Sequence, residues 1–111
     1  MHYLSSAAEL WPILTRLASE RRTETYGAVG REIGLIARGV SGALTPIHAY
    51  CERNDLPLLT ALVVRADTRR PGEGYQSPVD HIAECHMVYG YDWTKVTPPT
   101  GEEFRASIDL G

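Results

Sequence analysis

The stretch over residues 25–64 constrains the fold most, because its apolar pattern changes from a helical to an extended period. Its first segment has apolar residues at i, i+3 and i+7, on one helical face: Tyr26, Val29 and Ile33. Thr25 can cap the start of this helix, and Gly34 stands where a left-handed residue would end it. The pattern therefore predicts a helix over 26–33.

A second helical segment follows almost at once and predicts a helix over 37–53. The residues expected on its inward face are Ala37, Val40, Leu44, Ile47, Tyr50 and Cys51. Thr45 and Pro46 have the character of a new N-cap and first helical position, so we expect a break or kink at Pro46. Two helices joined by a tight turn with a glycine are typical of a helix-turn-helix.

The period changes after Asp55. The run LPLLTALVV is apolar and partly β-branched, which predicts a strand near 59–66. The Pro-Gly-Glu-Gly sequence beyond it predicts a turn, so that 65–74 would form a wing loop before a second arm near 73–76. Together these patterns predict an α+β fold: a small winged helix-turn-helix, mainly helical, with a two-stranded β wing.

The flanking segments predict further helices near 10–20 and 78–89. Ser6 and Glu9 have the spacing of a capping box that could start the first, but Pro12 then lies too deep for the first turn. We therefore expect either a kink at Pro12 or a start near Trp11. In the second, Ser77 is the expected N-cap. Apolar residues at i, i+3, i+4, i+7 and i+8 should form its buried face: Val79, Ile82, Ala83, His86 and Met87. Thr100 and Glu103 have the spacing of a capping box that would start one last short helix.

The composition is ordinary for a globular chain, with 111 residues of which 43% are apolar and 23% charged. This length predicts a single domain over 1–111, with an acidic helical extension at its C-terminal end. No apolar run reaches the roughly 20 residues that cross a bilayer, and the first residues lack the features of a secretory signal. We therefore expect a cytoplasmic protein without membrane contact, in which Cys51 and Cys85 are reduced and buried.

The net charge of −3 is unevenly distributed. Residues 77–111 hold two basic and six acidic residues, whereas 56–76 hold three arginines and two acids. A strong nucleic-acid binder usually shows a basic stripe, and here the positive excess around the wing is small. The acidic C-terminal third instead predicts a possible surface for a basic protein partner.

No signature of catalysis or metal binding stands out. The sequence contains no CxxC, HExxH, GxSxG or phosphate-binding loop. His48 with Cys51, and His81 with Cys85, each place two ligand types on one helical face, but both cysteines lie in apolar patterns where small thiols usually pack. We expect a non-enzymatic chain with no catalytic residue, cofactor or metal.

Three short motifs, TYG at 25–27, ARGVSGAL at 37–44 and LPLL at 56–59, resemble the winged-helix domain of alkylguanine-DNA alkyltransferases and alkyltransferase-like proteins. That family shows TYGE…IG…ARAVGxAL…LPxxxPCHRV, and the resemblance covers about a third of this chain. In the family, the tyrosine presses on DNA where a base is rotated out, and the arginine fills the gap in the stack. The resemblance assigns these roles to Tyr26 and Arg38.

Where the family has PCHRV, this chain has ALVVR at 61–65. The alkyl-accepting cysteine and its histidine are both absent, so the resemblance implies DNA docking without repair chemistry. We expect a non-catalytic protein that contacts duplex DNA through the 37–44 helix and the 65–74 wing. The expected DNA-binding residues are Thr25, Tyr26, Arg38, Ser41, Gly42, Arg65, Arg69 and Arg70.

Two alternatives remain open from the sequence. Tyr26 and Arg38 are equally consistent with a buried aromatic that has a polar tip and an ordinary surface cation. The whole chain is also consistent with a protein-interaction module or inhibitor, of mobile-element or defence-system type. Such a protein would bind a nucleic-acid enzyme rather than DNA, because fold alone does not choose between the two functions.

Overall fold

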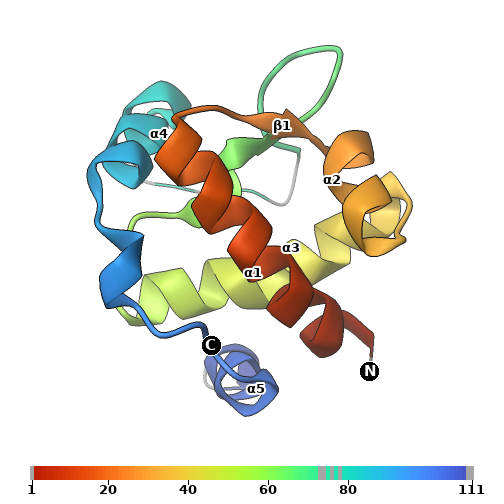
Figure 1. Ribbon diagram of the computed structural model, residues 1–111, viewed down its shortest axis with the longest axis vertical. Coiled ribbons are helices and arrows are strands. Elements are labelled where there is room, and N and C mark those ends of the chain that lie inside the picture. The colour runs from red at the N-terminus through yellow and green to blue at the C-terminus, as the bar shows by residue number, and fades with distance from the viewer. Residues whose placement is uncertain (1, 73–74, 76, 78, 110–111) are drawn as a thin grey trace.

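The computed structural model describes residues 2–72, 75, 77 and 79–109, and in these the chain is mainly helical with one two-stranded parallel sheet (Figure 1). The elements in chain order are α1 (His2–Glu20), β1 (Glu24–Thr25), α2 (Tyr26–Ile33), α3 (Ala37–Arg53), η1 (Leu59–Leu62), β2 (Val63–Val64), α4 (His81–Gly90), η2 (Trp93–Lys95) and α5 (Gly101–Asp109), where η marks a 3₁₀ helix. This is the α+β composition that the sequence predicts.

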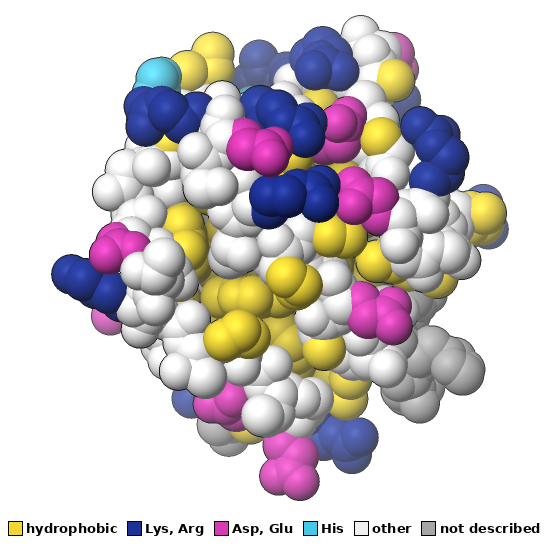
Figure 2. Space-filling view, in the orientation of Figure 1, with side chains coloured by type: hydrophobic (Ala, Val, Ile, Leu, Met, Phe, Trp, Pro, Cys, Tyr) yellow, Lys and Arg dark blue, Asp and Glu magenta, His cyan; other side chains and the backbone are white. Residues whose placement is uncertain are grey.

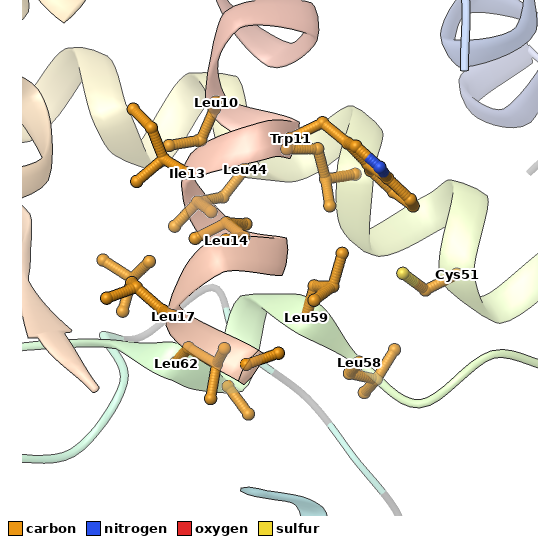
Figure 3. Close-up of a cluster of buried hydrophobic side chains, with 14 of the residues drawn as sticks. Leu10, Trp11, Ile13, Leu14, Leu17, Leu44, Cys51, Leu58, Leu59 and Leu62 are labelled. Carbon is orange, nitrogen blue, oxygen red and sulfur yellow. The ribbon is translucent and has the colours of Figure 1, made fainter. Parts of the chain in front are cut away.

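The core lies where α1 crosses α3 and η1 (Figures 1 and 3). Figure 3 shows leucines of α1 and η1 packed together: Leu10, Leu14, Leu17, Leu59 and Leu62. At the other side of α1, the Trp11 ring meets Tyr50, Trp93 and Phe104 at centroid distances of 5.8, 5.9 and 6.2 Å. One tryptophan therefore joins α1 to α3, η2 and α5.

Helix α1 is longer than predicted. It begins at His2 and runs through Pro12, so the expected start near residue 10 is wrong. A proline inside a helix removes the hydrogen bond to the carbonyl four residues earlier, here that of Ala8. Ala8 is exposed, so water can satisfy its carbonyl, while the buried residues on either side of Pro12 hold the helix against the core.

The helix predicted over 26–33 is confirmed as α2. The Thr25 side chain accepts a hydrogen bond from Ala28 N at 3.2 Å, and Gly34 ends the helix in the left-handed region with φ 75°. After a turn over 34–36, α3 runs without interruption from Ala37 to Arg53, so it is one helix through Pro46 rather than two. Pro46 is buried, and its packing offsets the lost backbone hydrogen bond.

The predicted strand near 59–66 is mostly wrong. Residues 59–62 form the 3₁₀ helix η1, and only Val63–Val64 is extended. The whole run from 58 to 64 is buried, and a short apolar run that is buried on all sides has no period that separates strand from helix. The sheet pairs β2 in parallel with β1, Glu24 opposite Val63, so it is not the two-stranded wing of a hairpin.

A closed loop takes the place of the predicted wing. The Arg65 N–H donates to the Arg70 carbonyl at 2.8 Å, and the Arg69 N–H donates to the Arg65 carbonyl at 2.9 Å. This loop arches beyond β1 in Figure 1. Of the second arm predicted near 73–76, only Tyr75 lies within the described residues, and it has no regular secondary structure there.

Helix α4 begins at His81, three residues later than predicted, because Asp80 rather than Ser77 is its N-cap. The Asp80 carboxylate accepts from Ile82 N and Ala83 N. The apolar face predicted to be buried is exposed instead: Val79, Ile82, Ala83, His86 and Met87. The residues of α4 that are buried are Glu84, Cys85 and Val88.

The last helix follows the sequence. Thr100 N donates to the Glu103 carboxylate at 2.9 Å, and Glu103 N donates to the Thr100 hydroxyl at 3.2 Å, which is the predicted capping box. Helix α5 then places Phe104 in the core. None of the described helices has both the length and the apolar character that a bilayer crossing requires.

Candidate nucleic-acid interface

A surface groove of about 850 Å³ lies where α2, α3 and the loop after β2 meet. Its lining residues are Thr25, Tyr26, Gly27, Arg31, Ala37, Arg38, Ser41, Arg65, Ala66, Asp67 and Gly72. Five of the eight residues expected to bind DNA are among them: Thr25, Tyr26, Arg38, Ser41 and Arg65. Residues from three separate parts of the chain thus converge on one surface.

Tyr26 fixes the two walls of the groove relative to each other. It is the first residue of α2, and its hydroxyl accepts a hydrogen bond from Gly72 N at 2.9 Å, across the groove. A Cβ at residue 72 would lie 3.0 Å from that hydroxyl, so the close approach depends on glycine. The ring is half-buried and packs against the core, which agrees with the alternative that Tyr26 is a buried aromatic with a polar tip. The same ring also lines the groove.

Removing the Tyr26 hydroxyl should loosen the loop without unfolding the chain. We expect Tyr26→Phe to lower the free energy of unfolding by about 1 kcal/mol, the usual net value of one hydrogen bond. Gly72 N is part-buried, so it can regain some solvation when the hydroxyl is lost. Chemical denaturation measures the change in stability, and faster amide exchange at Gly72 would locate it. Unchanged exchange at Gly72 would contradict the role given to this hydrogen bond.

Arg65 and Asp67 form an ion pair at the loop edge of the groove. The Arg65 guanidinium donates to both carboxylate oxygens, with N–O distances of 3.0 and 2.9 Å. These bonds, together with one from Thr68 N, lower the pKa of the Asp67 carboxyl to about 2. The pair is exposed, and its main effect is to orient Arg65 rather than to stabilise the fold.

Arg31 and Arg38 supply two of the three positive charges in the groove lining. Among the described residues, neither has a carboxylate partner within 4.0 Å. Arg16 and Arg22, by contrast, lie in a network with three glutamates. Exposed cations without a partner inside the protein are free to meet an external anion.

The start of α3 adds a second source of positive potential. Its N-cap is Ile36, which has no side-chain atom that could accept from the first backbone N–H groups. Ala37 and Arg38, in the first turn, both line the groove. Uncapped N–H groups and the helix dipole together favour an anion such as a phosphate at this place.

Three expected DNA-binding residues lie outside this lining. Gly42 belongs to the next turn of α3, and Arg69 and Arg70 are exposed on the loop. Arg69 is near enough to Glu24 that its charge contributes to lowering the pKa of that carboxyl, after the larger effects of Thr25 N and Arg22.

Arg31 is the arginine of the groove lining that the sequence analysis did not single out. Its Nη1 would lie 3.8 Å from a Cβ at Gly27, which shows that the guanidinium extends back along α2 toward the groove. The sequence feature that could have indicated this position is the i, i+4 spacing of Gly27 and Arg31. A glycine leaves room for a long side chain one turn later on the same helical face.

The cysteines and histidines that the structure describes do not gather into a metal-binding group. No group of three or more His, Cys, Asp or Glu side chains in the described residues has the geometry to hold an ion. Cys51 and Cys85 are free thiols and buried, as the sequence predicts, and burial raises the pKa of the Cys51 thiol to about 12. Cys85 Sγ lies 3.4 Å from His81 Nε2, but that nitrogen also lies 2.8 Å from the Ala61 carbonyl oxygen.

Comparisons with models of protein families, with curated proteins and with solved structures find no match to this chain.

Proposed function

We propose that this chain is a non-catalytic DNA-binding protein of helix-turn-helix type, which contacts duplex DNA through the groove at the start of α3. The observation that carries the proposal is that Arg31 and Arg38 both line the groove and have no carboxylate partner within 4.0 Å among the residues that the structure describes. Arg65 faces them from the loop. Three arginines and one aspartate are the charged residues of the lining, which leaves the groove positive on a chain whose net charge is −3.

In this proposal α2, the turn over 34–36 and α3 act as the helix-turn-helix, and the loop over 65–72 takes the role of a wing. The exposed residues at the start of α3 are mostly small, and Arg38 is the one long donor in the run from 37 to 42. Few side chains there can read base edges. The groove therefore suits contacts to phosphates and recognition of DNA shape more than direct readout.

Binding to a labelled duplex of about 20 base pairs, measured by fluorescence anisotropy at several salt concentrations, tests the proposal. We expect Arg38→Ala, which removes the one long donor at the start of α3, to weaken binding by about 1–3 kcal/mol, the range for an arginine that contacts bases. Arg31→Ala should weaken binding to all sequences alike, as loss of a phosphate contact does. Each arginine that contacts only phosphate should also reduce the salt slope by about one. Arg65, which is already oriented by Asp67, should behave in the same way.

Arg53→Ala is the matched control, because Arg53 is an exposed arginine in the last turn of the same helix. It should leave both the affinity and the salt slope unchanged. None of these variants should unfold the chain, since exposed substitutions usually change stability by about 0.5 kcal/mol or less. A parent chain that does not bind the duplex at low salt would refute the proposal, and so would Arg31 and Arg38 variants that bind as the parent does.

A further inference from the structure

The outward face of α4 carries an apolar stripe that the described part of the chain leaves uncovered. Among the described residues, four of the six large exposed hydrophobic side chains lie at or beside this helix: Val79, Ile82, Met87 and Tyr91. Ile82 is 63% exposed and Met87 50% exposed. Apolar residues on a helix normally face a partner, and exposed apolar patches on soluble chains commonly mark interaction sites.

The orientation of α4 is the reverse of that expected for a helix with one apolar face, which strengthens the case that the stripe is an interaction site. The helix buries a charged residue, Glu84, and turns its regular apolar spacing outward. Glu84 is only 4% exposed, and its two oxygens accept hydrogen bonds from Leu58 N at 2.9 Å and from the Ser77 hydroxyl at 2.8 Å. The orientation is thus fixed by specific hydrogen bonds.

A groove of about 590 Å³ runs along this helix, between α4 and the end of α3. Apolar side chains line much of it: Leu56, Pro57, Leu58, Val79, Met87 and Tyr91. The charged groups in its lining are three carboxylates, Glu52, Asp55 and Glu84, and no lysine or arginine belongs to the described residues that line it. The groove is therefore both apolar and negative.

The apolar surface continues beyond the groove through Tyr91. That ring also lines a neighbouring groove of about 620 Å³, whose walls include Trp93, Val96 and Pro98 on one side and Pro12 of α1 on the other. Figure 2 shows hydrophobic side chains gathered in the middle of the face on which α1 lies. The surface available to a partner is larger than the stripe on α4 alone.

We propose that this surface binds a basic amphipathic helix of another protein, which lays its apolar side on α4 and its lysines or arginines against Glu52 and Asp55. Helices that dock in grooves do so through apolar anchors at i, i+3, i+4 and i+7. Methionine adapts to such anchors well, because its side chain is unbranched and polarizable. Opposite charge at the edges steers the partner and fixes its register.

Charge disfavours the other occupants. A second copy of the chain, placed symmetrically, would bring the carboxylates of one groove against those of the other. Nucleic acid would be repelled by the same three groups. The groove along α4 shares no lining residue with the groove at the start of α3 that is proposed to contact DNA. The two grooves lie at opposite ends of α3, a helix of 17 residues or about 25 Å. The two surfaces can therefore be occupied together, and this inference does not depend on DNA binding.

Synthetic peptides test the proposal on the intact chain. The probe is a helix of about 18 residues with leucine along one face and lysine on the other. One comparison peptide has glutamate in place of lysine, and another has the lysine–leucine composition with leucines spread around the helix. We expect the amphipathic basic peptide to bind at least about tenfold more tightly than either, by calorimetry or anisotropy.

Variants locate the site. Met87→Lys should weaken binding of the basic amphipathic peptide by about tenfold or more, as loss of a central apolar anchor does. The double substitution of Glu52→Lys and Asp55→Lys should also weaken it and reduce its salt dependence. Ile36→Lys is the matched control, because Ile36 is a 75% exposed hydrophobic residue at the other end of α3, and it should bind as the parent does. Arg38→Ala should likewise leave peptide binding unchanged.

Equal binding of the three peptides, absence of binding, or a Met87→Lys variant that binds like the parent would overturn the proposal. So would a dimer of the chain, seen by sedimentation, that Met87→Lys dissociates, since the occupant would then be a second copy. Because the peptide and the DNA are measured separately, a failure of one surface is distinguishable from a failure of the other.

Discussion

Gly30→Ala should destabilise the chain by about 2–3 kcal/mol, at the upper end of the cost of overpacking. Gly30 lies in α2 at its contact with α3, and a Cβ there would overlap the Leu35 carbonyl oxygen and lie 3.1 Å from Val40 Cγ2. The first contact is with backbone, which cannot swing aside as the end of a side chain can. The Gly30 carbonyl also accepts from Leu35 N at 2.8 Å, so any shift strains the turn between the two helices.

Gly27→Ala is the control for this prediction within the same helix. A Cβ at residue 27 would meet only Arg31 Nη1, at 3.8 Å, within the 4 Å range that matters for packing. Replacing a helical glycine by alanine without a clash usually stabilises by about 0.4–1 kcal/mol. Thermal unfolding should therefore show a lower melting temperature for Gly30→Ala and an equal or higher one for Gly27→Ala. Two shifts of the same sign would contradict the close packing inferred at Gly30.

Capping residues correctly predicted the helix ends that depend only on neighbouring backbone. Thr25 and Gly34 limit α2 as expected, because a hydroxyl cap and a left-handed glycine act on the nearest turn of backbone. The Thr100 and Glu103 capping box began α5 for the same reason. Such signals need no knowledge of what the rest of the chain does.

Tertiary contacts decided the segments that the sequence failed to predict. The apolar run over 58–64 is buried on all sides, so its period could not separate the 3₁₀ turn of η1 from a strand. The partner of β2 is β1, which lies 39 residues earlier at Glu24 opposite Val63, and no local pattern indicates a pairing of that range. α1 likewise tolerates Pro12 because the core holds the helix on both sides.

The candidate groove was predictable in part. The motifs that carry the family resemblance supplied Thr25, Tyr26, Arg38 and Ser41, and the loop supplied Arg65, all of which the fold brings to one surface. The resemblance did not indicate Arg31, whose position depends on how α2 lies against the loop. Nor could it show that Arg69 and Arg70 fall outside the lining, since that follows from the closed shape of the loop.

Helix α4 shows why a period alone does not tell which face is buried. Its apolar residues have helical spacing, yet they face outward while Glu84 faces inward. A carboxylate is buried at low cost only when donors replace its water, and Leu58 N and the Ser77 hydroxyl do so here. Neither donor is recognisable from the sequence of the helix itself.

Glu84→Ala should therefore destabilise the chain by about 2–4 kcal/mol, because it leaves a buried donor without a partner and opens a cavity. The donor is Leu58 N, whose hydrogen bond to the Glu84 carboxylate, 2.9 Å long, joins α4 to the segment that leads into η1. Denaturant titration measures the loss. Faster amide exchange at Leu58 would show that the helix has separated from this segment.

Glu84→Gln separates the hydrogen bonds from the charge. The glutamine carbonyl can still accept from Leu58 N, and its amide can donate to the Ser77 hydroxyl, which rotates to accept. Stability should then fall by no more than about 1 kcal/mol, the net value of one hydrogen bond. A glutamine variant as unstable as the alanine variant would mean that the negative charge itself holds α4 in place. If the glutamine variant folds normally, the two hydrogen bonds alone account for the inverted orientation of α4. In the natural chain, the negative charge of Glu84 then serves the groove that it lines rather than the fold.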